Sequence, residues 1–257
     1  MSLRSFYSQR SVLYALVVSN FKGQYNNSKL GVLWQFISPI IIVLLFYVVF
    51  TSIRISEVNN LWLMLCAGIF PYTFMESAIV SGSMCLVNNG YMLKKMQFPR
   101  IFIVVAHIVT SLITFTIILL FVIAIALLSG CYISATHLIE LVPLTFITFI
   151  FNIGLAAILS SVVVYYRDLG HFIGATSRLL FWMSPTIYTI QDVSGLLERI
   201  MSLNPLTYYI SNYHQLIYYN APLSLLSFCL CVVMSVFVLC VGLMLFKKLE
   251  GGFAERL

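Results

Sequence analysis

Charged side chains are scarce in this chain, and that scarcity decides its class. Of the 257 residues only 9% are charged, whereas 61% are hydrophobic, and the mean hydropathy is +1.01. A soluble domain carries about 25% charged residues, so this composition does not supply a water-exposed surface. The sequence predicts an integral membrane protein whose apolar surroundings are the bilayer itself.

The motifs of the common enzyme and nucleotide-binding classes are missing as well. The sequence has no G-x-x-x-x-G-K-[ST] loop, no Rossmann glycine pattern, no H-E-x-x-H and no G-x-S-x-G, and these are the patterns that would indicate a nucleotide site, a zinc site or a serine nucleophile. Its six cysteines form no C-x-x-C pair, so they are interpreted as small packing residues. We expect no catalytic residue, metal or cofactor in this chain, and no binding to nucleic acid.

Long apolar stretches are what the chain has in abundance. A helix needs roughly 20 apolar residues to cross about 30 Å of hydrocarbon. Six stretches qualify, and they are Phe36–Ile53, Leu61–Leu86, Ile101–Leu128, Leu138–Tyr165, Phe172–Ile190 and Leu223–Phe246. Pro39 and Pro185 lie inside the first and fifth, where neighbouring helices can satisfy the freed carbonyl groups. The predicted fold class is an all-α integral membrane protein with six transmembrane helices.

Basic residues fall in alternate gaps between these stretches. Three gaps hold most of the basic residues, namely Arg4, Arg10, Lys22 and Lys29 before the first stretch, Lys94, Lys95 and Arg100 after the second, and Lys247, Lys248 and Arg256 after the sixth. Lysine and arginine favour the cytoplasmic side of a membrane. Both termini are therefore expected in the cytoplasm.

The whole chain, residues 1–257, is expected to form a single membrane domain. Val12–Val18 is apolar but too short to cross the bilayer, so we predict an N-terminal interfacial helix there. The predicted parts are a cytoplasmic entry segment at 1–35, spans one to five at 36–190, an external gate-like segment at 191–222, and the sixth span with a cytoplasmic tail at 223–257.

The external segment is unusually aromatic for a hydrated loop. Its ring-bearing candidates for an external gate are Tyr208, Tyr209, Tyr213, His214 and Tyr218. Tyrosine is enriched where a chain meets the headgroup region, so we expect interfacial or re-entrant helices before the last span. Two interpretations stay open, an aromatic belt that anchors the segment and a gate that moves.

Two charged residues lie within the apolar stretches, Glu76 in the second and Arg178 in the fifth. Each costs several kcal/mol if it faces lipid, so each should face protein or water. They either pair and hold two helices together or line a conduit. Around them, helical spacing places aromatic and hydrogen-bonding side chains on shared faces, a combination that suits sugars.

Four short motifs occur in an order that resembles one family. They are Tyr25–Trp34 (YNNSKLGVLW) followed by Pro39, Lys94-Lys95 with Phe98-Pro99-Arg100, Tyr166-Arg167-Asp168 with Ser184-Pro185, and Leu203–Thr207 (LNPLT). Together they resemble the ABC-2-type polysaccharide exporter permeases, the membrane subunits that export O-antigen, capsule or teichoic-acid chains. The resemblance covers essentially the full length.

The resemblance implies a multi-pass permease of the bacterial inner membrane that moves a lipid-linked, O-antigen-like polysaccharide. It implies a homodimer in contact with membrane lipids and with two copies of a separate P-loop ATPase, which would hold the ATP and Mg. The substrate channel would draw on Phe46, Phe50, Trp62, Tyr72, Glu76, Arg178, Phe181 and Trp182. Coupling to the ATPase would draw on Tyr25, Lys29, Lys94, Lys95, Arg100, Arg167 and Asp168. The alternatives are an ABC-2 permease for another lipid or a drug, and a multi-spanning enzyme of envelope assembly.

Overall fold

The computed structural model describes residues 10–23, 33–52, 60–95 and 98–256, and within these ranges the chain is helical and contains no β-strand. The helices are α2 (Arg10–Gly23), α3 (Trp34–Ser52), α4 (Leu61–Ile79), α5 (Ser81–Asn88), α6 (Gly90–Lys95), α7 (Ile101–Leu128), α8 (Ala135–Tyr165), α9 (Leu169–Trp182), η2 (Ile190–Asp192), α10 (Leu196–Leu203), α11 (Pro205–Tyr213), η3 (His214–Tyr218), α12 (Leu225–Leu249), η4 (Glu250–Gly252) and α13 (Phe253–Arg256).

Four helical segments in the described ranges are long and apolar enough to cross a membrane. They are Leu61–Asn88, which joins α4 and α5, then α7, α8, and Leu225–Gly252, which joins α12 and η4. These segments agree with the second, third, fourth and sixth predicted stretches. The other two predicted spans are shorter, since α3 contributes the apolar segment Ile37–Ser52 and α9 has 14 residues.

The fifth predicted stretch, Phe172–Ile190, is not one continuous helix, and that expectation is wrong. Helix α9 ends at Trp182, because the residue before a proline is disfavoured in helical conformation and Ser184 precedes Pro185. The side-chain amide of Asn204 donates to the Met183 carbonyl (3.1 Å) and to Ser184 Oγ (2.8 Å). The break is therefore held by the Asn204 of the external motif, which also begins α11.

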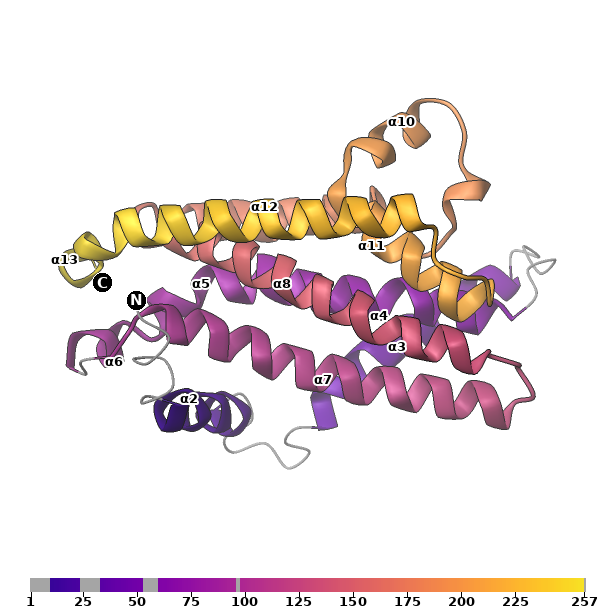
Figure 1. The fold of residues 1–257 in the computed structure, drawn as a ribbon, viewed down its shortest axis with the longest axis horizontal. Coiled ribbons are helices and arrows are strands. Elements are labelled where there is room, and N and C mark those ends of the chain that lie inside the picture. The colour runs from indigo at the N-terminus through magenta and orange to yellow at the C-terminus, as the bar shows by residue number, and fades with distance from the viewer. Residues whose placement is uncertain (1–9, 24–32, 53–59, 96–97, 257) are drawn as a thin grey trace.

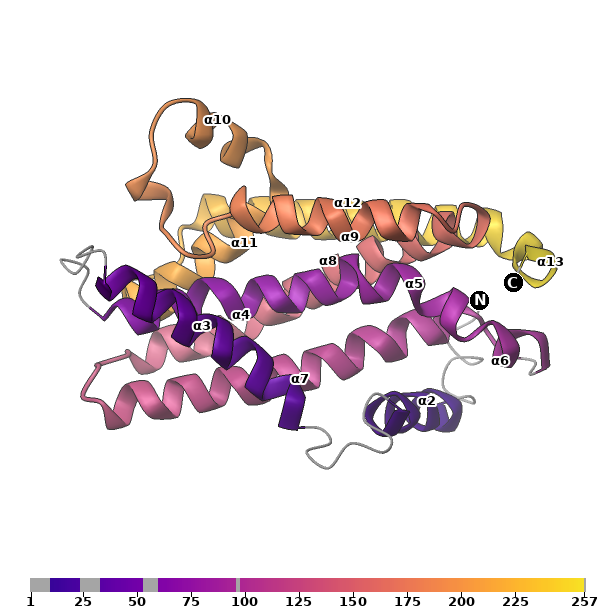
Figure 2. The same ribbon diagram turned by 180° about the vertical axis from the view of Figure 1, so that it is seen from behind.

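The long helices run side by side, and the short ones gather at the two ends (Figure 1). Helices α6 and α13 lie at one end of the bundle, while α10 stands out from its side toward the other end. Seen from behind, α3 crosses α4 obliquely (Figure 2). The helix expected in the entry segment is present as α2, which packs against α7 and is seen end-on in both views, so it lies across the bundle.

Helices α8 and α12 pack with their backbones in contact. A Cβ on Gly242 would lie 2.4 Å from the Gly154 carbonyl oxygen, and a Cβ on Gly154 would lie 2.6 Å from Leu239 Cα. Small residues allow this approach between membrane helices, where van der Waals packing replaces the hydrophobic effect. These two helices form the most tightly joined pair of the bundle.

Candidate functional site

Five aromatic side chains from three helices meet beside α4, and we call them the aromatic cluster: Phe46 and Phe50 of α3, Tyr72 of α4, and Phe181 and Trp182 of α9. The ring of Phe46 lies 6.0 Å from Phe50, 6.0 Å from Phe181 and 6.2 Å from Trp182, and Tyr72 lies 5.2 Å from Phe181. Centroid distances of 4.5–7 Å mark direct ring contact. The structure thus brings together channel candidates that the sequence places in three separate spans.

A hydrogen-bonded pair of polar groups joins α4 to α9 next to this cluster. The Tyr72 hydroxyl donates to the Ser177 carbonyl, and Ser177 Oγ donates to the Glu76 carboxylate at 3.1 Å. Ser177 is the one buried side chain of α9. Glu76 is therefore held by a neutral hydroxyl, and its neighbour Tyr72 is fixed in the same contact.

Arg178 and Trp182, two channel candidates of α9, lie on its outer surface next to Leu179. The side chain of Arg178 is exposed, and Trp182 and Leu179 are 56% and 63% exposed. A guanidinium that faces lipid costs several kcal/mol. Within a bilayer, this face of α9 would need contact with protein or water.

Trp62 lies apart from the aromatic cluster. It lines an apolar hollow of about 430 Å³ together with Ile40, Val43 and Phe70, on the side of α4 that faces α3 and α7. Although Trp62 and Tyr72 share the same helix, they are separated by nearly three turns. The structure does not bring Trp62 together with the other channel candidates.

The predicted gate residues divide into buried and partly buried groups. Tyr209 donates to the Cys231 carbonyl (2.9 Å), and Tyr213 donates to Thr145 Oγ1 (3.2 Å), so these hydroxyls attach α11 to α12 and α8. Tyr208 and Tyr218 are only partly buried. Tyr209 and Tyr213 therefore fix the segment to the bundle, and the role of all these residues in gating stays a prediction.

His214 also fixes this segment, which lies between α9 and α12 rather than in a membrane-crossing helix. Its Nε2 donates to the Met64 carbonyl at 3.1 Å, at the start of α4. Burial lowers the pKa of His214 to about 4, an effect that this hydrogen bond and the charge of Asp192 partly oppose. The imidazole is therefore neutral at physiological pH and acts as a structural hydrogen-bonding group.

The predicted coupling residues that the structure describes lie at the α6 end of the bundle. Lys94, Arg167 and Asp168 are exposed and Arg100 is partly buried. Lys95 is the last residue of α6, but its side chain lies outside the described part of the chain. Tyr25 and Lys29 lie outside the described residues altogether.

The C-terminal turn formed by η4 and α13, residues 250–256, connects two of these coupling loops, and we call it the C-terminal clasp. Arg100 donates to the Glu250 carbonyl, and Arg167 donates to the Arg256 carbonyl at 2.9 Å. The buried ring of Phe253 lies 5.4 Å from Phe246. The loop after α6 and the turn after α8 are therefore attached to the same short segment.

Sequence reasoning missed the residues that hold the clasp and the α4–α9 contact. Tyr165 donates to the Leu249 carbonyl (3.0 Å), and the Arg256 guanidinium carbon lies 4.7 Å from its ring centroid. Tyr165 directly precedes the Tyr-Arg-Asp motif, and Phe253 is an aromatic residue in an otherwise polar tail. Ser177 is a hydroxyl residue next to Arg178. Tyr165, Phe253 and Ser177 were therefore each marked only weakly in the sequence.

The chain belongs to the ABC-2 type transporter family, whose sequence model matches residues 11–218. It is thus a membrane subunit of a transporter, in agreement with the resemblance carried by the four motifs.

Among individual proteins, the chain is similar along its whole length to O-antigen export system permease proteins named RfbA. It is 26% identical over 260 residues to one from Klebsiella pneumoniae, which covers 100% of both chains. It is also 26% identical over 263 residues to the one from Myxococcus xanthus, which covers 99% of this chain and 98% of that protein. A second Klebsiella pneumoniae protein of this name is 24% identical over 260 residues.

Proposed function

We propose that this chain is the permease subunit of an ATP-driven exporter that moves a lipid-linked, O-antigen-like polysaccharide across the bacterial inner membrane. The family and the full-length similarity to proteins named as O-antigen export permeases support this function. The single structural observation that carries it is the aromatic cluster, because aromatic faces stack on the C–H faces of sugars without binding them through charge.

We also propose that the chain crosses the membrane six times and that both of its termini lie in the cytoplasm. Helices α3 and α9 count as crossings in addition to the four long segments. The α6 end of the bundle, which also holds α13, is then the cytoplasmic end. The basic residues of α6 and of the end of α12 support this orientation, since they fall at the same end.

The conduit is proposed to form between two copies of the chain, with the aromatic cluster along its wall. The exposed Arg178 and Trp182 of α9 support a second copy, because a membrane-embedded guanidinium needs protein or water around it. Glu76 and Ser177 add hydrogen-bonding groups beside the rings. The wall is then mostly aromatic and weakly polar, which lets a long glycan slide.

The ATPase is proposed to be a separate subunit that docks on the α6 end. Lys94, Arg100, Arg167 and Asp168 form the described part of this docking surface, and Tyr25, Lys29 and Lys95 are proposed to extend it. The C-terminal clasp supports joint movement of the two loops, because Arg100 and Arg167 both donate to its carbonyl groups.

The first test is affinity purification from the native membrane under gentle conditions, followed by mass spectrometry. A P-loop ATPase at equal stoichiometry is expected, and lipid-linked glycan should stimulate its ATP turnover. Lys94→Glu should reduce recovery of the ATPase, while Tyr91→Phe, at another exposed position of α6, should not. Recovery of the chain alone would favour an envelope-assembly enzyme, and stimulation by lipids or drugs without glycan would favour another ABC-2 substrate.

A further inference from the structure

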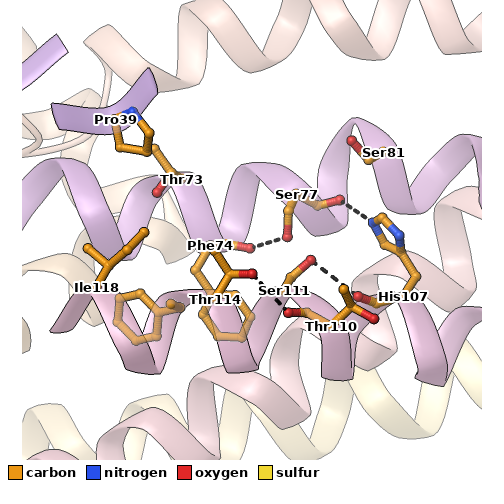
Figure 3. A pocket seen from close by; sticks show the side chains of 11 residues that line it. Pro39, Thr73, Phe74, Ser77, Ser81, His107, Thr110, Ser111, Thr114 and Ile118 are labelled. Carbon is orange, nitrogen blue, oxygen red and sulfur yellow. Dashed lines mark hydrogen bonds between the residues drawn. The ribbon is translucent and has the colours of Figure 1, made fainter. Parts of the chain in front are cut away.

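A second cavity, of about 440 Å³, lies between α4 and α7 beneath the first turns of α3. Figure 3 shows hydroxyl groups from both helices pointing into it. Its lining consists of Pro39, Thr73, Phe74, Ser77, Ser81, His107, Thr110, Ser111, Thr114, Phe115 and Ile118. Thr73 and Ser77 directly follow Tyr72 and Glu76 in α4, so they point about 100° away from the aromatic cluster. The cavity is therefore separate from the conduit candidates.

Most hydroxyl groups of this cavity donate their own hydrogen atom to a carbonyl group of the same helix. Thr73 donates to the Phe70 carbonyl (2.8 Å), Ser77 to Phe74 (2.8 Å) and Ser111 to His107 (3.2 Å). A hydroxyl that donates in this way keeps lone pairs that can accept. The cavity therefore offers acceptors and needs a ligand that supplies donors.

His107 adds one more acceptor to this wall. Its Nε2 lies 3.3 Å from the Ser77 carbonyl oxygen, and because a carbonyl only accepts, Nε2 carries the hydrogen. In the neutral ring the other nitrogen, Nδ1, is then an acceptor. The side chain is only 8% exposed, so its orientation is fixed by packing as well as by the hydrogen bond.

None of the eleven lining residues is charged, which argues against a charged ligand. A phosphate or pyrophosphate group would lack a cation, and an ammonium group would lack a counter-charge in a medium where unpaired ions are costly. An uncharged ligand rich in hydroxyl donors fits, with its C–H faces against Pro39, Phe74 and Ile118. The volume falls within the range of about 300–1,000 Å³ that is usual for small-molecule sites.

We infer that this cavity binds an uncharged, hydroxyl-rich ring, namely a sugar unit of the transported glycan, on the α7 side of α4. The inference rests on the proposed function and adds a sugar site outside the aromatic cluster. Acceptors on α4 and α7 hold the hydroxyls of the ring, and the apolar side chains cover its faces.

Photocrosslinking tests the inference directly. Benzophenone-alanine replaces Ser111, in the cavity, or Ile113, which is 38% exposed on another face of α7. The variants are expressed in cells fed radiolabelled glucose that either make the glycan or lack the glycosyltransferase that begins it. A labelled, high-mass adduct is expected at position 111 only in glycan-making cells, and no such adduct at position 113.

Removal of single acceptor oxygens from the cavity should weaken the binding of the sugar ring. Thr73→Val and Ser111→Ala each remove one acceptor oxygen and should lower the adduct yield of a probe at position 118 roughly fivefold, as expected for about 1 kcal/mol per hydrogen bond. The matched control is Thr116→Val, since Thr116 is exposed on α7 and also donates to its own helix. Equal loss in all three variants would overturn the inference.

A further probe, at Trp182, separates failure of the cavity inference from failure of the proposed function. A glycan adduct at position 182 without one at position 111 overturns the cavity inference and leaves the exporter intact. The same adducts at position 111 in both cell types also overturn it, because they would come from membrane lipid. No glycan adduct at either position contradicts the proposed function as well.

Discussion

The α8–α12 side of the bundle and the α3–α9 side are built on different principles. Between α8 and α12, Gly154 and Gly242 bring backbones into contact, and Tyr209 shares hydrogen bonds with the Cys231 carbonyl and Ser235 Oγ. Helix α9 buries only Ser177, and α3 leaves most of its apolar residues exposed. The two sides differ in how their helices are joined rather than in how much they bury, since α12 itself buries only Cys231, Ser235, Gly242 and Phe246.

This difference indicates which part of the molecule is held most firmly by its own contacts. A region with small residues and satisfied buried hydrogen bonds is costly to rearrange. The α3–α9 side joins the rest mainly through aromatic contacts and the Ser177–Glu76 hydrogen bond. Movement and subunit contact are therefore expected on the α3–α9 side, where the candidate conduit lies.

The largest stability effect is expected at the α8–α12 contact. Gly242→Ala places a Cβ 2.4 Å from the Gly154 carbonyl oxygen, and overpacking of this kind costs about 1–3 kcal/mol. Gly174→Ala in α9 is the control, because no atom lies within 4 Å of the added Cβ. Thermal unfolding in detergent should show a clear loss for the first variant and none for the second. Equal losses of thermal stability in the two variants would contradict the difference between the α8–α12 side and the α3–α9 side.

Acidification should weaken the segment that His214 attaches to α4. The pKa of this histidine falls from 6.5 to about 4 on folding, so the unfolded chain binds the proton more tightly. Its contribution is complete above pH 6.5 and is lost as the pH falls toward 4, about 2 kcal/mol of it by pH 5. His214→Asn should have a smaller drop in melting temperature between pH 7.5 and pH 5. An unchanged drop would show that other groups govern acid sensitivity.

Substitutions of Glu76 test the hydrogen bond that Ser177 Oγ donates to the Glu76 carboxylate. Glu76→Gln keeps an acceptor for Ser177 Oγ, whereas Glu76→Ala removes it, which costs about 1 kcal/mol of stability. Glycan export should persist in the first variant and fall in the second, with both recovered at normal levels in the membrane. Normal export by Glu76→Ala would remove this residue from the conduit.

A modest effect on stability and a clear effect on transport are expected for Phe181→Leu. The substitution replaces a ring that contacts Phe46 and Tyr72 with an aliphatic side chain, and it should cost less than about 1.5 kcal/mol. Export should slow, because the glycan loses a stacking surface. Phe172→Leu is the control, since Phe172 is 67% exposed near the start of α9. Equal transport by the two variants would contradict the role of the cluster.

Length and hydropathy predicted the long helices well because crossing a bilayer imposes a simple minimum length. The predicted limits of α7, Ile101–Leu128, agree with the structure. The prediction of a continuous fifth span, Phe172–Ile190, missed the end of α9 because it placed Pro185 inside the helix. Asn204, 20 residues from Ser184, is what stabilises the break.

Helical periodicity predicts which residues share a face of one helix, but it does not predict which residues of other helices pack against that face. It placed Tyr72 and Phe181 on the same kind of mixed surface, and the structure brings these two rings together. Trp62 and Tyr72 of α4 were both assigned to the channel, yet Trp62 lines an apolar hollow apart from the aromatic cluster. Phe253 and Tyr165 were missed because their partnership joins residues far apart in the chain, and no local pattern encodes that contact.

The shortness of α9 has a consequence for the lipid around it. Its 14 residues rise about 21 Å, which is some 9 Å less than the roughly 30 Å of hydrocarbon in a typical bilayer. In the proposed topology α9 crosses the bilayer, and a crossing helix this short draws the two headgroup layers toward each other or is screened by a neighbouring subunit. Beside the aromatic cluster, the membrane is then at its thinnest, and a polar chain that passes there has the shortest stretch of hydrocarbon to cross.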